Sequence, residues 1–391
     1  MEKLDIQKLR SETPGCNHVL HFNNAGSALP PFVVVNSVKS HLDLEAEIGG
    51  YEAANQAVDQ SEKVYKVAAK LINCNPDEIA FTDNATRAWK SAFYSFRFKK
   101  GDRILTCFSE YASNYLTFLY MAKRTGVTID VIKDDLNGQL DLDDLKNKLD
   151  NDVKLIAITH VPTQGGLINP VLEVGKYAKQ MNIPYLLDTT QSLGQIPIDV
   201  RAINCDFLCG TGRKYLRGPR GTGFLYARKS IIDQCDLPSI EIHSGKWNTD
   251  NEYQLRLDAR RFETWEQNIA GKIGLATAID YALQLGIPTI WKRIQYLAML
   301  FRKKLTELSN IDLRDLGENK CGIVTFTSKR DTAEKIQKYL SHHRINVSIS
   351  MQEHAKLDLE RRNINALIRA SVHYYNTEEE INRFCEMLRL L

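Results

Sequence analysis

The sequence predicts an α/β fold, in which helices sandwich a mainly parallel sheet and a smaller α+β domain follows at the C-terminal end. Two features indicate this fold. Short apolar runs alternate with helical stretches between about residues 79 and 226, as in parallel sheets covered on both faces. After about residue 265 the pattern changes to a long helical region, followed by strands around one helix.

The apolar runs of the first part predict strands, because they are short, continuous and bounded by turn residues. Strands of this kind are typical of a sheet that is buried on both faces. The predicted strands cover residues 79–82, 103–106, 155–159, 184–187, 207–209 and 224–226. Helical patterns between them cover residues 85–98, 113–123 and 171–181.

The last third of the chain reads differently. One helical pattern covers residues 269–308, and a Gly-Ile-Pro sequence breaks it at 286–288. Strands at 322–326 and 366–372 flank a helix at 332–342, and a final helix begins after Asn376 or Thr377. Glu380 stands three residues after Thr377, as a capping box requires.

The composition is that of a globular protein: 43% of the residues are hydrophobic and 25% are charged. The 51 basic and 48 acidic residues leave a net charge of +3, which argues against a nucleic-acid groove as the main function. The longest charge-free stretch, residues 13–38, holds four Asn, two His and three Pro, so we expect no membrane span there.

No secretory signal is visible, and the eight cysteines form neither a disulfide framework nor a zinc-site pattern. We therefore expect a soluble cytoplasmic enzyme that has reduced thiols and no metal, and that binds neither nucleic acid nor a membrane.

The segment from residue 185 to 226 carries the chemistry. Asp188 ends one predicted strand, and Lys214 follows the end of the next one. In an open parallel sheet, ligands bind beyond the carboxyl ends of the strands, so the two side chains can converge. A lysine and a carboxylate suggest pyridoxal phosphate: the lysine forms a Schiff base and the carboxylate pairs with the ring nitrogen. Thr211 and Arg213 could hold the phosphate.

These residues also allow a simpler interpretation, in which Asp188 forms a turn and the Gly-rich segment is an ordinary loop. Nucleotide-binding patterns fail, because Gly210-x-Gly212 lacks the third glycine and no P-loop is present. The residues alone leave the choice between a cofactor site and a loop open.

Several motifs in order resemble the class V aminotransferases, the superfamily of the cysteine desulfurases. They extend over most of the chain and follow the family's order. The motifs are Phe22-Asn23-Asn24-Ala25-Gly26, Thr159-His160-Val161, Asp188-Thr189-Thr190-Gln191, Cys205-Asp206-Phe207, Gly212-Arg213-Lys214, Gly218-Pro219-x-Gly221-x-Gly223, Arg261-Phe262-Glu263, Arg369-Ala370-Ser371 and Tyr375-Asn376-Thr377-Glu378-Glu379-Glu380. The resemblance implies fold type I of the pyridoxal phosphate enzymes and a homodimer.

The resemblance also implies three parts of the chain. We expect an N-terminal segment at 1–20 that packs on the small domain, a large cofactor-binding domain at 21–280 and a small C-terminal domain at 281–391.

Residue roles follow from the matched positions. Lys214 stands at the catalytic lysine, Asp188 at the carboxylate for the ring nitrogen, and Gln191 at the contact to the ring hydroxyl. The implied phosphate-binding residues are Ala85, Thr86, Thr211 and Arg213, together with Asn268 across the subunit interface. Further implied contacts are Tyr111 stacking on the ring, Thr163 near its substrate side, and Arg369 and Asn24 at the substrate. Arg369 would bind the substrate carboxylate, which a guanidinium can grip with two hydrogen bonds.

Two departures from the family pattern bear on the reaction. The segment 348–354 stands where one branch of the family carries a loop with the persulfide-forming cysteine, and it contains no Cys. Cys321 precedes an apolar strand and is interpreted as structural. Trp265 and Glu266 replace a small Gly-Thr loop, and Ile269 stands at the position of its phosphate-binding Thr.

The sequence thus predicts a pyridoxal phosphate enzyme acting on an amino acid, with β-elimination at a C–S bond as the leading reaction. Transamination and epimerisation share the same proton abstraction at Cα and stay open as alternatives. A non-catalytic protein of this fold is a more distant alternative.

Overall fold

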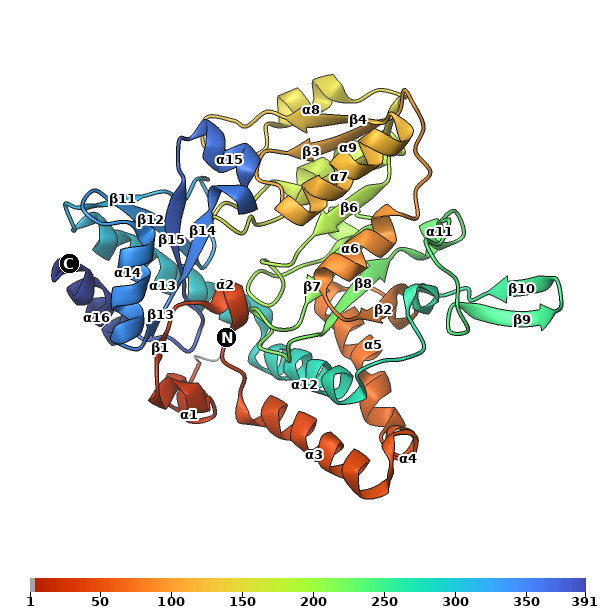
Figure 1. Ribbon diagram of the computed structural model, residues 1–391, viewed down its shortest axis with the longest axis horizontal. Coiled ribbons are helices and arrows are strands. Elements are labelled where there is room, and N and C mark those ends of the chain that lie inside the picture. The colour runs from red at the N-terminus through yellow and green to blue at the C-terminus, as the bar shows by residue number, and fades with distance from the viewer. Residues whose placement is uncertain (1–3) are drawn as a thin grey trace.

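The computed structural model describes residues 4–391. A seven-stranded sheet forms its centre (Figure 1). The strand order is β2-β8-β7-β6-β5-β3-β4. β8 runs antiparallel to both neighbours, and all other neighbouring strands are parallel. The strands are β2 (Ile79–Thr82), β3 (Arg103–Cys107), β4 (Thr128–Ile132), β5 (Val153–Thr159), β6 (Tyr185–Asp188), β7 (Phe207–Thr211) and β8 (Gly223–Ala227). This sheet confirms the predicted fold class.

Helices cover both faces of the sheet. On β3, Ile104 belongs to an apolar core that includes Trp89 and Phe118, whereas its neighbour Leu105 belongs to a separate core on the opposite face. Successive side chains of a strand point to opposite faces, so both faces are buried. The helices around the sheet are α5 (Val58–Ile72), α6 (Ala85–Phe93), α7 (Ala112–Thr125), α8 (Leu142–Lys148), α9 (Val171–Gln180), α10 (Val200–Ile203), α11 (Lys229–Ile232) and α12 (Ile269–Leu285).

A second sheet lies in the C-terminal part, drawn in blue at the left of Figure 1. It is antiparallel, with the order β11-β12-β15-β14. Its strands are β11 (Ile311–Leu313), β12 (Ile323–Ser328), β14 (Ser348–Met351) and β15 (Ala366–Ser371). The helices here are α13 (Ile287–Thr306), α14 (Ala333–His342), α15 (Lys356–Arg361) and α16 (Glu378–Arg389). Thr377 and Glu380 form the predicted capping box of α16.

The N-terminal segment lies against this C-terminal part. β1 (Leu20–His21) pairs in parallel with β13 (Ile345–Asn346), and Arg10 forms an ion pair of 2.9 Å with Glu380. The elements at this end are α1 (Ile6–Ser11), α2 (Asn24–Ser27), α3 (Phe32–Ile48) and α4 (Gly50–Gln56). The division into three domains stays a prediction, and its boundary after residue 280 falls inside α12.

The structure corrects several predicted element boundaries. The helix expected at 85–98 ends at Phe93, because the chain then turns and places Phe98 5.3 Å from the Phe93 ring and Phe96 5.8 Å from Phe207. The segment 348–354 is not a loop, since β14 pairs with β15 and a 3-10 helix follows at Gln352–His354. The predicted break at 286–288 is confirmed: α12 ends before Gly286, whose φ is +80°, and α13 begins after it.

Among the elements that were not predicted are the edge strand β4 and a hairpin of β9 (Gly245–Thr249) and β10 (Glu252–Leu255) that projects from the body (Figure 1). Three other 3-10 helices lie at Pro14–Asn17, Pro76–Glu78 and Ala259–Phe262. Within residues 4–391 no single helix meets the length and hydropathy needed to cross a membrane. α12 and α13 meet that test only as a pair, and they are bent by 79°.

Candidate cofactor site

A cavity of about 430 Å³ opens at the carboxyl ends of β5, β6 and β7. Thr159, Asp188 and Thr211 are the last residues of these parallel strands, which brings their side chains to one edge of the sheet. The cavity is lined by Asn84, Ala85, Thr86, Tyr111, Asn114, Thr159, Val161, Thr163, Asp188, Thr190, Gln191, Thr211, Arg213 and Lys214. Every predicted cofactor contact except Asn268 lies among them.

Lys214 lies in a tight turn after β7. Within the turn, Gly218 donates its N–H to the Gly212 carbonyl and Arg217 donates to the Lys214 carbonyl. The lysine side chain is buried, and no hydrogen bond or ion pair engages its Nζ among residues 4–391. Burial lowers the pKa of Lys214 well below its usual value, and the nearby Arg213 and Arg369 lower it further. The site therefore favours a neutral amine, which is the nucleophilic form.

Asp188 and Gln191 face the same cavity. One carboxylate oxygen of Asp188 accepts the Thr190 N–H at 2.9 Å, and the other accepts from Asn114 Nδ2 at 3.0 Å. The Gln191 amide donates to the Ala25 carbonyl at 3.1 Å, while its Oε1 is buried without a partner among the described residues. A buried acceptor of this kind fits a ligand that supplies the missing donor.

The start of α6 forms a donor-rich end of the cavity. The first N–H groups of a helix have no partners within the helix, and they favour an anion. Asn84 caps the helix by accepting the Arg87 N–H at 2.9 Å, and Thr86 follows in the first turn.

Arg213 adds a cation to this end of the cavity. Its guanidinium donates to the Gly26 carbonyl, and both burial and the neighbouring Arg220 lower its pKa. A cation beside a helix start fits a phosphate group.

Arg369 reaches the cavity region from β15. Its Nη1 donates to the Thr163 carbonyl at 3.0 Å and to Thr163 Oγ1 at 2.6 Å, and its Nε donates to Ser348 Oγ at 3.0 Å. Burial lowers the pKa of Arg369 to about 10, and Arg213 also lowers it. Arg213 and Arg369 thus give the surroundings of Lys214 an excess of positive charge. Such an excess suits a ligand that carries a phosphate and a carboxylate.

The structure does not bring Asn24 into the cavity. Its Nδ2 donates to the carbonyls of Ser371, at 2.7 Å, and His21, at 3.2 Å, and its Oδ1 accepts from the Tyr375 hydroxyl. The side chain therefore joins α2 to β15. The neighbouring Ala25 carbonyl is the group that reaches the site, through Gln191.

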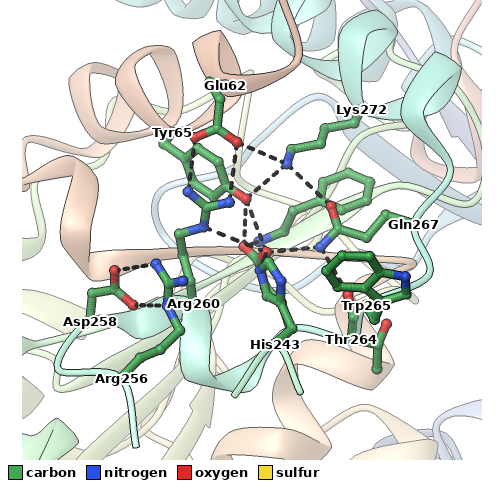
Figure 2. A network of polar contacts seen from close by, with 12 residues as sticks. Glu62, Tyr65, His243, Arg256, Asp258, Arg260, Thr264, Trp265, Gln267 and Lys272 are labelled. Carbon is green, nitrogen blue, oxygen red and sulfur yellow. Dashed lines mark hydrogen bonds and ion pairs between the residues drawn. The ribbon is translucent and has the colours of Figure 1, made fainter. Parts of the chain in front are cut away.

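Asn268 does not line the cavity of its own chain either. It caps α12 by accepting the Gly271 N–H at 2.7 Å. The segment before it is held by the polar network of Figure 2. There the buried Glu263 accepts from Tyr65 at 2.8 Å, from the Phe81 N–H at 2.8 Å and from Gln267 at 2.8 Å. A role of Asn268 in the partner's site stays a prediction.

Lys272 and Arg260 complete this network. Lys272 donates to Tyr65 at 2.9 Å, and Arg260 binds Glu62 with both terminal nitrogens (Figure 2). Trp265, which the sequence singles out as a departure from the family, stays 57% exposed beside it. The network thus fixes the segment before Asn268, while the Trp265 side chain stays accessible to another chain.

Sequence reasoning missed two polar residues next to Asp188. Asn114 lines the cavity, and Glu110 lies buried behind it with a hydrogen bond of 2.9 Å between them. Glu110 stands just before the N-cap of α7 and Asn114 lies in the first turn of that helix, so it is the packing of the helix start that brings the two side chains together.

Comparison with known proteins identifies the family of the chain. The family model of aminotransferase class V matches residues 19–384. The chain belongs to the class V aminotransferase family. A relative from Pyrococcus abyssi, described as a probable cysteine desulfurase, is 33% identical over 396 residues, which cover 98% of this chain and 97% of the relative.

Solved structures agree with this family. The apo cysteine desulfurase of Thermococcus onnurineus NA1 is 28% identical with a TM-score of 0.92, over 100% of this chain and 99% of that one. A cystine C–S lyase, C-DES, solved with its product cysteine persulfide, is 21% identical with a TM-score of 0.85 over 96% and 98% of the chains, and it shows the same fold. This class V family member is a pyridoxal phosphate-dependent enzyme of fold type I.

The residues present fit that cofactor. The cavity offers a buried lysine, a carboxylate at the end of β6, and a helix start beside a cationic side chain. The roles of the individual residues stay proposals.

Proposed function

We propose that this enzyme cleaves the C–S bond of a sulfur-containing amino acid by β-elimination, and that the sulfur leaves as a free thiol or sulfide. The observation that carries the proposal is the absence of a thiol from the cavity. None of the eight cysteines, all of which lie in the described part of the chain, is among the lining residues. The apo cysteine desulfurase of Thermococcus onnurineus has the same fold. The proposal therefore differs from a desulfurase in where the sulfur goes: into solution, and not onto a thiol of the protein.

The segment 348–354 supports this proposal, because it holds no cysteine. β14 is hydrogen-bonded to β15 along its length, with Ser348 opposite Arg369. Cys321 is fully buried, and burial raises the pKa of its thiol to about 11, so it is a poor thiolate. A reaction that releases the sulfur directly needs no protein thiol.

The proposed cofactor contacts follow the geometry above. Lys214 would join the aldehyde carbon, Asp188 would pair with the ring nitrogen and Gln191 would bind the ring hydroxyl. Thr86, Thr211 and Arg213 would hold the phosphate, with Tyr111 stacked on the ring. When bound, pyridoxal phosphate withdraws electrons from Cα of a joined amino acid and thereby acidifies the Cα proton.

The protein side chains carry the remaining steps. Arg369 binds the substrate carboxylate and, being held by Thr163 and Ser348, fixes its direction. The Lys214 amine takes the Cα proton and holds it at Nζ, which its depressed pKa permits. The C–S bond then breaks and its electron pair leaves with the sulfur. The three-carbon product takes up water, so that substrate and water yield a thiol, pyruvate and ammonia.

Product analysis tests the proposal. The enzyme loaded with pyridoxal phosphate is incubated with cysteine, cystine and cysteine conjugates, and pyruvate, ammonia and the released sulfur product (sulfide, persulfide or thiol, respectively) are measured. We expect equal amounts of the three, and none from the Lys214→Ala variant. A keto acid of the intact side chain would favour transamination. Exchange of the Cα proton for deuterium without product would favour an epimerase, and a Cys321→Ser variant serves as the control for a thiol role.

We further propose a homodimer. Support comes from the family and from the β9–β10 hairpin, on which Trp247 lies directly opposite Tyr253. The two side chains are 76% and 60% exposed. An aromatic pair on a projecting hairpin is typical of a contact surface. The cytoplasmic location stays a prediction.

A further inference from the structure

Behind Asp188 lies a second carboxylate. Glu110 is buried between the end of β3 and the start of α7, and it is held by four donors. Its Oε1 accepts from the Tyr111 N–H at 2.8 Å, from Asn114 Nδ2 at 2.9 Å and from Thr159 Oγ1 at 2.5 Å. Its Oε2 accepts from Thr106 Oγ1 at 2.9 Å. Three of these donors thus bind Oε1 and one binds Oε2, so the fold fixes the orientation of this carboxyl group.

Asn114 lies between the two carboxyl groups. One amide N–H donates to Glu110, and the same nitrogen donates to Asp188 Oδ2 at 3.0 Å. With an acceptor on each side, the amide can present only its NH₂ group to them, because its own oxygen would meet two acceptors. Glu110 therefore determines which end of the Asn114 amide faces Asp188.

Asp188 depends on this donor for its orientation. Its other side-chain hydrogen bond comes from the Thr190 backbone, at 2.9 Å. Together the two donors fix the plane of the carboxylate, as outer partners do for functional side chains. We propose that Glu110 and Asn114 are positioning residues that hold the Asp188 carboxylate in the orientation needed to pair with the ring nitrogen of the cofactor. This inference rests on the role proposed for Asp188.

The protonation of Glu110 is compatible with this role. Burial raises the pKa of Glu110 to about 7, and the Asp188 carboxylate raises it as well. A glutamine would keep the Oε1 acceptor and resemble the protonated acid, whereas a leucine would remove the acceptor. The two variants therefore separate the hydrogen bond from mere occupation of the space.

The test compares Glu110→Gln, Glu110→Leu, Asn114→Leu and the double leucine variant, each loaded with pyridoxal phosphate. The readouts are the visible absorption band of the bound cofactor, kcat, KM and Tm. We expect Glu110→Gln to stay within about twofold of the wild type. Both single leucine variants should shift the band and lower kcat about tenfold, with KM within about twofold. The double variant should resemble Asn114→Leu, since the two residues act in series.

The matched control is Glu78→Leu. Glu78 is also buried and accepts two backbone N–H groups, from Asn75 at 2.9 Å and from Lys229 at 3.0 Å, but it does not line the cavity. This change should lower Tm and leave the band and kcat unchanged. If Glu110→Leu behaves like this control, or if the two leucine changes add fully, the inference is wrong.

The Asp188→Asn variant separates this failure from failure of the proposed function. A wild-type protein that takes up no cofactor, or whose band is unaffected by Asp188→Asn, contradicts the proposed role of Asp188 itself. A band that responds to Asp188→Asn but to neither leucine variant contradicts the positioning role alone.

Discussion

Individual charges define the candidate site. Lys214 is buried near Arg213 and Arg369, and the carboxylate of Asp188 only partly offsets these cations. Such an arrangement is unfavourable without a ligand, since like charges repel strongly when removed from water. An anionic cofactor and a carboxylate substrate relieve this repulsion. The positive surroundings thus serve both binding and the activation of Lys214.

Replacing Arg369 with lysine tests the carboxylate contact. A lysine keeps the charge but cannot form two parallel hydrogen bonds. We expect KM for the amino acid to rise about tenfold, with kcat changed less, which corresponds to about 1.4 kcal/mol of lost binding. Steady-state kinetics measure this effect. The exposed Arg97→Lys serves as the control, and an unchanged KM in Arg369→Lys would rule out the contact.

The buried Glu110 makes a pH prediction. Its pKa is about 7 in the folded protein and 4.5 in an ordinary glutamate, so the folded state binds the proton more tightly. Stability from this group is therefore present below pH 4.5 and is lost as the pH rises to about 7. Between pH 4.5 and about 7, the free energy of unfolding of the wild type should fall by up to about 3 kcal/mol relative to that of Glu110→Gln. Denaturant unfolding at several pH values measures the difference. A constant difference would contradict the prediction.

The sequence correctly predicted that residues at strand ends lie in the cavity. It was less reliable for residues whose position depends on tertiary contacts. Asp188, Gln191 and Lys214 follow apolar strands, and parallel strands carry such residues to one edge. Asn24 shows the limit, because its neighbour Ser371 lies at the far end of the chain. Asn114 was missed since its orientation depends on how α7 packs.

At the level of elements, apolar strands of the central sheet were predictable and exposed ones were not. β4 carries Asp130, which pairs with Arg103 and Lys148, so its apolar pattern is interrupted. The β9–β10 hairpin is mostly exposed, and Trp247 is the one large apolar residue of β9, so no apolar run marks the hairpin. The family resemblance implied a loop at the position of β14, whereas the tertiary fold pairs this segment with β15.

The network around Glu263 makes a prediction about the segment 264–268. Replacing Glu263 with alanine removes the buried acceptor of the Tyr65 hydroxyl, the Phe81 N–H and the Gln267 amide, and it also removes the ion pair with Arg260, in the network of Figure 2. We expect the free energy of unfolding to fall by about 3 kcal/mol. Denaturant unfolding measures the loss, and the exposed Thr264→Ala is the control. A change below about 1 kcal/mol would show that the network contributes little.

For the whole molecule, the projecting hairpin predicts association of two chains. Removing Trp247 and Tyr253 together deletes the exposed aromatic pair. Sedimentation should give twice the chain mass for the wild type and a shift toward single chains for the Trp247→Ala, Tyr253→Ala variant. Leu136→Ala, another exposed apolar residue, is the matched control. A monomeric wild type would contradict the proposed dimer.

The destination of the sulfur tests the central claim most directly. Elimination leaves a keto acid, whereas transfer of sulfur to a protein thiol puts a proton in its place and leaves alanine. The measurement is NMR of isotopically labelled cysteine turned over by the loaded enzyme, together with the mass of the intact protein. We predict labelled pyruvate and an unmodified chain. Labelled alanine, with sulfur added to a cysteine of the chain, would contradict the account.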